Sequence, residues 1–212
     1  MFFWSQRRRL SEAKCCSAAY FRLPRGSTQS GPIKRIRRIF MNQFSSCGNP
    51  EMHLLSVLRG RPQAAARVSG SESCPGISGT VRFYQTDEGA VVWAEINGLP
   101  VPELPCRKRI FGFHIHKGTD CGGNMDDPFA DAMSHYNPSG CEHPYHAGDL
   151  PPLFGNNGYA LCVFLTDRFS VKEVIGRTII IHDHPDDFTT QPSGNSGTKI
   201  ACGVICRAAG AC

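Results

Sequence analysis

The 212-residue sequence contains no apolar run long enough to cross a membrane. It does not open like a secretory leader either, because MFFWSQRRR puts its apolar residues before its charges. The apolar stretch LLSVL at residues 54–58 is too short for the core of such a leader. We therefore expect no membrane span and favour a cytoplasmic protein. Export or organelle targeting stays open, since an Arg-rich, Ser-rich and acid-poor N-terminus is typical of mitochondrial leaders.

Acidic residues are nearly missing from the first forty positions, which hold ten Lys and Arg against one Glu. Residues 41–212 hold 13 basic and 17 acidic residues, a net charge of −4, so the overall charge of +5 belongs to the N-terminal arm. The arm mixes basic clusters with Ser, Gly and Pro and has no helical or strand period. We therefore assign residues 1–61 to a basic, disordered extension and residues 62–212 to a folded domain.

A basic arm can bind nucleic acid through its charge. We favour two other interpretations, a leader or translation from an upstream start with Met41 opening the native chain. No nucleic-acid partner is expected for the folded domain.

The sequence also lacks a C-x-x-C pair and any regular cysteine spacing, although it contains 11 cysteines. An odd count leaves at least one thiol free or paired between chains. We expect most of these cysteines to be small buried residues or inert thiols rather than bridges.

Helical periodicity is missing beyond residue 62, where short apolar segments alternate with turns. Segments such as GTVRFYQTD alternate apolar and polar side chains, which predicts strands. Eight short strands favour an antiparallel sandwich or barrel. The expected strands cover residues 64–70, 79–87, 90–99, 107–116, 148–154, 158–167, 177–183 and 199–209. Two connections, 117–147 and 183–198, are too long for simple turns, and long loops on a rigid sheet often carry functional sites.

Two histidines stand out on the strand-like segment FGFHIH at residues 111–116. His114 and His116 are two positions apart, so their side chains point to the same face of a strand. A lone histidine there would be a hydrogen-bonded core residue. Two together favour a metal site, because imidazole is the commonest metal-binding side chain.

The first long loop carries further candidate ligands in the segment HYNPSGCEHPYHAGD. His143, His146 and Asp149 recur every three residues, and His135 completes a His₃Asp set, which suits a tetrahedral zinc site. The alternative is a polar loop that happens to be rich in histidine. The ligand types favour zinc over calcium or magnesium, which prefer oxygen donors.

His182 ends the strand-like segment RTIIIH and can join His114 and His116 from a neighbouring strand. His135 is also able to bind a metal together with these three histidines. A nitrogen-rich cluster in near-planar arrangement suits copper. The sequence therefore predicts two metal sites that share one histidine.

Residues 64–207 resemble the copper/zinc superoxide dismutase family in the motifs GFHIHKGTDC, HYNPSG, HAGDL, GRTIIIHDHPDDF and GNSGTKIACGVI. The resemblance implies an all-β fold, an eight-stranded Greek-key β-barrel (an immunoglobulin-like sandwich) with two long functional loops. It also implies one copper and one zinc per subunit. It assigns copper to His114, His116, His135 and His182, and zinc to His135, His143, His146 and Asp149.

Two further features follow from the same resemblance. Asp186 matches a carboxylate that links a copper ligand to a zinc ligand, here His114 and His143, and such carboxylates fix the tautomer of the ring. Cys202 matches a half-cystine of the barrel. Its implied partner is Cys121, with Cys141 as a rival, and the bridge would pin the first long loop to the sheet.

The implied activity is the dismutation of superoxide to dioxygen and hydrogen peroxide, an antioxidant reaction. In the family, copper alternately accepts and donates one electron, and the bridging histidine, here His135, carries a proton. Superoxide is thus the expected substrate, and the resemblance is compatible with a homodimer.

Lys199 departs from the family pattern, which has an arginine in the loop before the last strand. The positive charge that attracts the anionic substrate is kept, but the planar fork of donors is lost. We therefore expect dismutase activity that is retained but reduced, with His135 and Lys199 as the catalytic residues. The alternative is a copper/zinc-binding or copper-transfer module on the same barrel with little or no dismutase turnover.

Overall fold

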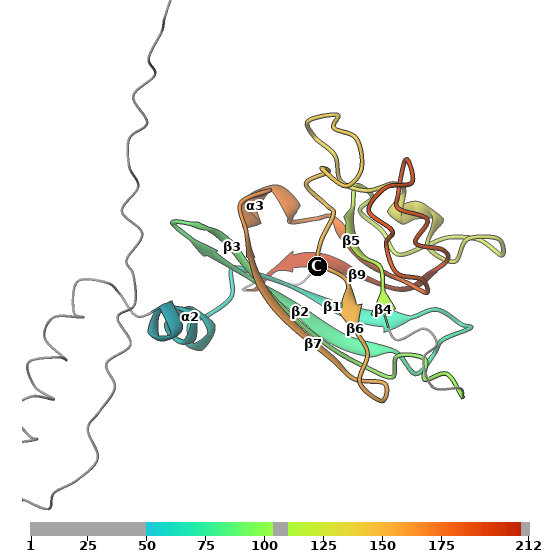
Figure 1. Ribbon diagram of the computed structural model, residues 1–212, viewed down its shortest axis with the longest axis horizontal. Coiled ribbons are helices and arrows are strands. Elements are labelled where there is room, and N and C mark those ends of the chain that lie inside the picture. Colours follow the sequence, from blue (N-terminus) through green and yellow to red (C-terminus); the bar gives the residue numbers. More distant parts are fainter. Residues whose placement is uncertain (1–49, 104–109, 209–212) are drawn as a thin grey trace, which may run out of the picture. The chain divides into compact units, whose positions relative to one another are not determined.

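The computed structural model describes residues 50–103 and 110–208, which form antiparallel strands, short helices and long loops (Figure 1). The strands are β1 (Ala64–Gly70), β2 (Ser78–Thr86), β3 (Gly89–Asn97), β4 (Ile110–Phe111), β5 (Phe113–His116), β6 (Leu153–Phe154), β7 (Ala160–Thr166), β8 (Thr178–His182) and β9 (Lys199–Arg207). The helical segments are α2 (Pro50–Arg59), the 3₁₀ turn η1 (Ala130–Ala132) and α3 (Val171–Val174).

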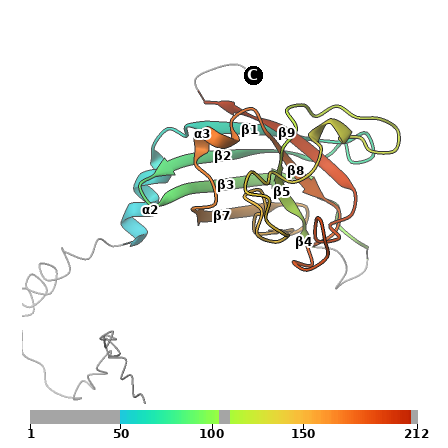
Figure 2. The same cartoon turned by 90° about the horizontal axis from the view of Figure 1, so that it is seen from above.

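Seven strands form one antiparallel sheet in the order β5-β8-β9-β1-β2-β3-β7, and β4 pairs with β6. After the β1-β2-β3 meander the chain crosses to β5 at the opposite edge, returns to β7 beside β3, and crosses again to β8. These crossings are Greek-key connections. The sheet curls around its inner face (Figure 2), and Phe111 of β4 and Leu153 of β6 join the same core. The expected all-β fold is confirmed.

The core follows from the alternation of side chains along each strand. Val81 and Phe83 of β2 lie opposite Ala94 and Val92 of β3, and all four are fully buried. Each large apolar side chain removed from water in this way contributes about 1.5–3 kcal/mol to folding. The buried face of the sheet therefore forms a rigid base for the loops that leave it.

Gly112 divides the strand that the sequence predicts over 107–116 into β4 and β5. Its N–H donates to the carbonyl of His184 (2.7 Å), and its carbonyl accepts from the N–H of His182 (2.8 Å). A Cβ atom here would lie 3.0 Å from the Cβ of Ser196 and 3.2 Å from that of His182. The close approach of these segments needs glycine, and it interrupts the pairing of the predicted strand.

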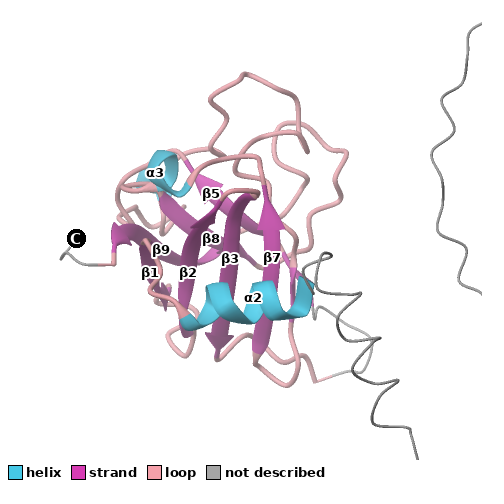
Figure 3. Ribbon diagram, turned by 90° about the vertical axis from the view of Figure 1, so that its left-hand side faces the viewer, coloured by secondary structure: helices cyan, strands magenta, loops and turns pink. Residues whose placement is uncertain are grey.

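Helix α2 corrects the assignment of residues 1–61 to a disordered extension. Residues 50–59 are helical, and this helix lies across β2, β3 and β7 (Figure 3). Leu54 and Val57 line a groove together with Val91 and Val163 of the sheet. Their spacing of three places both side chains on one face of the helix. Residues 1–49 of the assigned extension lie outside the described residues. Within 50–103 and 110–208, no helix combines the length and hydropathy needed to cross a bilayer.

A disulfide joins the loop after β5 to strand β9. It links Cys121 to Cys202, whose Cα atoms are 5.8 Å apart, whereas the rival Cys141 is an exposed free thiol. Phe129 of the same loop packs on Ile180 of β8 in a small cluster beside the bridge. The loop is thus held to the sheet both by a covalent bond and by apolar contacts.

Candidate metal centre

Four histidine side chains converge where β5 and β8 pair. His114 and His116 come from β5, His182 ends β8, and His135 comes from the loop that follows β5. One ring nitrogen of each lies within 4.8 Å of those of the other three, and all four residues are buried. The nitrogen-rich cluster predicted for copper is therefore assembled by the fold.

A second cluster shares His135 with the first. It consists of His135, His143, His146 and Asp149, again buried and with ligand atoms within 4.8 Å of one another. The carboxylate of Asp149 lies 2.7 Å from Nδ1 of His135, 3.1 Å from Nδ1 of His143 and 3.3 Å from Nδ1 of His146. This is the His₃Asp donor set that the loop spacing predicts.

Two backbone hydrogen bonds of Ile115 hold this loop against the outer edge of β5. The Ile115 N–H donates to the carbonyl of Gly148 (2.9 Å), and the Ile115 carbonyl accepts from the N–H of Tyr136 (2.8 Å). Isolated bridges then place His114 beside Asp149 and His116 beside His135. Backbone pairing on an edge strand thus brings distant ligands to the histidines of β5.

Backbone carbonyls orient two of the rings in the first cluster. Nδ1 of His116 bonds to the carbonyl of Met133 (2.7 Å), and Nδ1 of His182 bonds to that of Gly197 (3.2 Å). A carbonyl can only accept, so Nδ1 carries the proton in both rings and Nε2 carries a lone pair. The two Nε2 atoms lie 3.3 Å apart and face the interior of the cluster.

Asp186 links the two clusters through one histidine of each. Its Oδ2 accepts from Nε2 of His114 (2.8 Å), and its Oδ1 accepts from Nε2 of His143 (2.9 Å). Both rings therefore direct Nδ1 toward their clusters. Gly194, with φ of 67°, lies against this bridge, and a Cβ there would come within 2.0 Å of Asp186 Oδ1.

Several nitrogens in these clusters are buried without a hydrogen-bond partner. They are Nδ1 of His114, Nε2 of His135, Nδ1 of His143 and Nδ1 of His146. An unpaired buried polar atom costs about 1–3 kcal/mol. The lone pairs of these nitrogens point into the two clusters, and a bound metal ion would satisfy them. The residues present therefore fit a copper ion and a zinc ion that share His135.

Burial favours the neutral form of three histidines in the first cluster, His114, His116 and His182. It lowers the pKa of His114 to about 4, although the hydrogen bond to Asp186 opposes the shift. Burial, assisted by the nearby charge of His114, lowers the pKa of His182 to about 3, and burial also lowers the pKa of His116. Neutral imidazole is the form that binds metals.

Lys199 opens β9 directly opposite His182 of β8. Its Nζ bonds to Oδ2 of Asp127 (2.6 Å) and to the carbonyl of Phe129 (3.0 Å). The cation predicted to attract substrate thus lies beside the first cluster and is paired with a carboxylate. Nothing in the spacing of the sequence signals this partner, which is 72 residues away.

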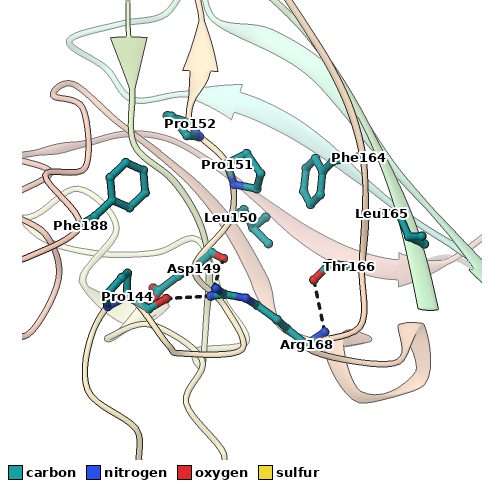
Figure 4. A pocket seen from close by; sticks show the side chains of 10 residues that line it. All are labelled: Pro144, Asp149, Leu150, Pro151, Pro152, Phe164, Leu165, Thr166, Arg168 and Phe188. Atoms are coloured by element: carbon teal, nitrogen blue, oxygen red, sulfur yellow. Dashed lines mark hydrogen bonds between the residues drawn. The ribbon is translucent and has the colours of Figure 1, made fainter. Parts of the chain in front are cut away.

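Arg168 also contacts the loop that carries the second cluster (Figure 4). Its Nη1 donates to the carbonyls of Pro144 (2.8 Å), His146 (3.2 Å) and Asp149 (3.4 Å), all on the loop that carries the second cluster. One guanidinium from the loop after β7 therefore links three backbone carbonyls of the loop that carries that cluster. A lone arginine in the turn TDRFS carries no sequence signal for such a role.

Comparisons with known proteins agree with this geometry. A family model described as copper/zinc superoxide dismutase (SODC) matches residues 77–205. The chain is 35% identical over 135 residues to a Cu-Zn superoxide dismutase of Legionella pneumophila, covering 60% of this chain and 76% of that protein. It is 32% identical over 148 residues to one of Deinococcus radiodurans, covering 61% of this chain and 77% of that protein.

A solved structure is similar as well. It is the crystal structure of a double mutant of a SOD-like protein from Bacillus subtilis, with a TM-score of 0.53 and 30% sequence identity. The similarity covers 66% of this chain and 94% of that chain.

The metal-free protein should lose stability as the pH falls. Histidine in the unfolded chain has a pKa near 6.5, whereas folding lowers the pKa of His114 to about 4 and that of His182 to about 3. The unfolded state therefore binds more protons, so the stability present above pH 6.5 declines between about 6.5 and 3. Each histidine contributes roughly 1.4 kcal/mol per pH unit within its window. Urea unfolding at pH 7.5, 5.5 and 4.5 measures this, and equal midpoints would contradict it.

Arg168→Ala should weaken the second cluster. Without the guanidinium, three carbonyls lose their donor and the loop is less ordered, so zinc should dissociate roughly 10–100-fold faster. Competition with a chromogenic chelator measures the rate. Arg82→Ala is the control, since Arg82 contacts Trp93 and Glu95 on the sheet. Equal zinc release from both variants would show that Arg168 does not order the site.

Proposed function

Because the chain belongs to the copper/zinc superoxide dismutase family, we propose which of its residues perform each part of that family's reaction. The protein is an oxidoreductase that converts superoxide to dioxygen and hydrogen peroxide, with copper and zinc as cofactors. The proposal rests chiefly on one observation, the buried histidine nitrogens that have no hydrogen-bond partner and point into two adjoining clusters.

We assign the first cluster to copper and the second to zinc. The copper ligands are Nδ1 of His114 and Nε2 of His116, His135 and His182; the zinc ligands are Nδ1 of His135, His143 and His146 and the carboxylate of Asp149. When bound, copper supplies one-electron chemistry by accepting an electron from one superoxide and donating one to a second, while zinc is redox-silent. The hydrogen bonds of Met133 and Gly197 hold two of the copper-site rings in the required tautomer.

His135 is the residue shared by the two sites. Its Nδ1 is held by Asp149 at 2.7 Å, and its Nε2 faces the other histidines without a hydrogen-bond partner. When this nitrogen is not ligated it can hold a proton next to the reacting oxygen and donate it to the peroxide product. A zinc ion bound by this Nδ1 and by Asp149 would fix the ring, so the proton would be delivered from one defined position.

Lys199 supplies positive charge beside the first cluster. Its side chain is 14% exposed and lies opposite His182 in the strand pairing. A fixed cation near the mouth of a site raises the local concentration of an anionic substrate. We propose that Lys199 performs this attraction in place of an arginine fork.

A rate measurement on reconstituted protein tests these roles. After loading with copper and zinc, the wild type should remove superoxide far faster than free copper. His135→Ala should lower the rate by about 10²-fold or more, because it removes the shared ligand and the proton carrier. His184→Ala is the matched control, since His184 is a half-exposed histidine outside both clusters. Comparable losses in both variants would contradict the assignment.

The lysine also favours one competing function, a copper-transfer module with little turnover. That function predicts no activity above free copper in the wild type, together with rapid copper transfer to a chelator. If Lys199→Arg alone then restored dismutation, the defect would lie in the attraction of substrate rather than in the metal sites.

We also propose that two copies of the chain form a homodimer. The support is an apolar stripe on the edge strand β7, where Leu161, Val163 and Leu165 are 54%, 36% and 55% exposed. Apolar side chains that share one face of a strand and stay exposed favour association through that face. Sedimentation should give twice the mass of one chain, and Leu161→Lys with Leu165→Lys should give a single-chain mass. A wild type with the mass of one chain would overturn the proposal.

A further inference from the structure

The ammonium of Lys199 forms a salt bridge with a carboxylate, although the attraction of an anionic substrate needs only the positive charge. The ammonium lies 2.6 Å from Oδ2 of Asp127 and 3.0 Å from the carbonyl of Phe129. The Lys199 side chain is 14% exposed and that of Asp127 is 40% exposed. An approaching anion therefore meets a salt bridge, with the carboxylate on its more exposed side.

Apart from Lys117, which directly follows His116, the two long loops next to Lys199 contain no other cation. Residues 183–198 contain no Lys or Arg but three aspartates, and residues 118–149 contain no Lys or Arg but several acidic side chains. Lys199 is the cation that the strand pairing places opposite a histidine of the first cluster, and it is therefore the one positioned to attract a monoanion there. A carboxylate in contact with that lysine cancels most of its field beyond a few ångströms.

The backbone holds Asp127 in this position. Its Oδ1 accepts the N–H of Phe129 (3.0 Å), so the carboxylate is fixed by the turn and presents Oδ2 to the lysine. Its carbonyl also accepts the N–H groups of Asn124 (2.9 Å) and Ala130 (3.2 Å). The pairing is therefore part of the loop structure.

We propose that Asp127 is a positioning residue that fixes the Lys199 ammonium and attenuates its attraction for superoxide. The inference rests on the proposed role of Lys199 in guiding the substrate. The negative charge of Asp127 therefore lowers the rate of reaction with superoxide, and removing this charge accelerates the reaction.

The test is Asp127→Asn, which keeps the Oδ1 acceptor for Phe129 and removes only the charge. Asp126→Asn is the matched control, because it makes the same change in net charge at the adjacent exposed position. At low ionic strength Asp127→Asn should raise the rate constant with superoxide about two- to tenfold over wild type. The rate should also fall more steeply with added salt. Asp126→Asn should change both quantities much less.

A second readout does not depend on turnover. Azide, a monoanion, can be titrated into the copper-loaded protein and followed by its visible absorption. Asp127→Asn should bind azide several-fold more tightly than wild type, and adding Lys199→Met to this variant should abolish the gain. Loss of the gain in the double variant assigns the effect to the lysine rather than to a rearranged loop.

The outcomes separate the inference from the proposed function. If all proteins dismutate superoxide but Asp127→Asn matches Asp126→Asn in rate, salt dependence and azide affinity, the inference is wrong and the function stands. A slower Asp127→Asn enzyme with unchanged azide affinity would also overturn it. If none of the proteins dismutates superoxide while Asp127→Asn tightens azide binding through Lys199, the inference holds and the proposed function fails.

Discussion

The structure depends on the burial of imidazole nitrogens that no protein group satisfies. Nitrogens of His114, His135, His143 and His146 are removed from water without a hydrogen bond, at a cost of about 1–3 kcal/mol each. Burial also lowers the pKa of His114 to about 4, so protonation does not relieve the cost of its unpaired nitrogen near neutral pH. Metal ions remain the partners that fit, and the fold is organised to hold them in a shared site.

Three sets of contacts hold these histidines in place. The apolar face of the sheet fixes β5 and β8, and the histidines stand on the opposite face of these strands. Backbone pairing at Ile115 and the disulfide from Cys121 hold the long loop against the sheet. Asp186 then joins the second loop to both clusters through His114 and His143. Ligands from distant parts of the sequence are thus positioned by contacts that are largely independent of the metals.

Much of this arrangement can be predicted from the sequence, because it follows from short-range periodicity. The two-residue spacing of His114 and His116 places them on one face, and three-residue spacing brings His143, His146 and Asp149 into one loop cluster. Contacts between distant loops carry no such periodicity. The partners of Lys199 and Arg168, and the break in a strand caused by tertiary contact around Gly112, therefore appear only in three dimensions.

Anomalous diffraction from crystals loaded with copper and zinc tests the shared-histidine site most directly. Data collected at the absorption edge of each metal should give two peaks on opposite sides of the His135 ring. The copper peak should lie against Nε2 of His135 with His114, His116 and His182, and the zinc peak against Nδ1 of His135 with the remaining ligands. A single peak, or two peaks that His135 does not separate, would contradict the assignment.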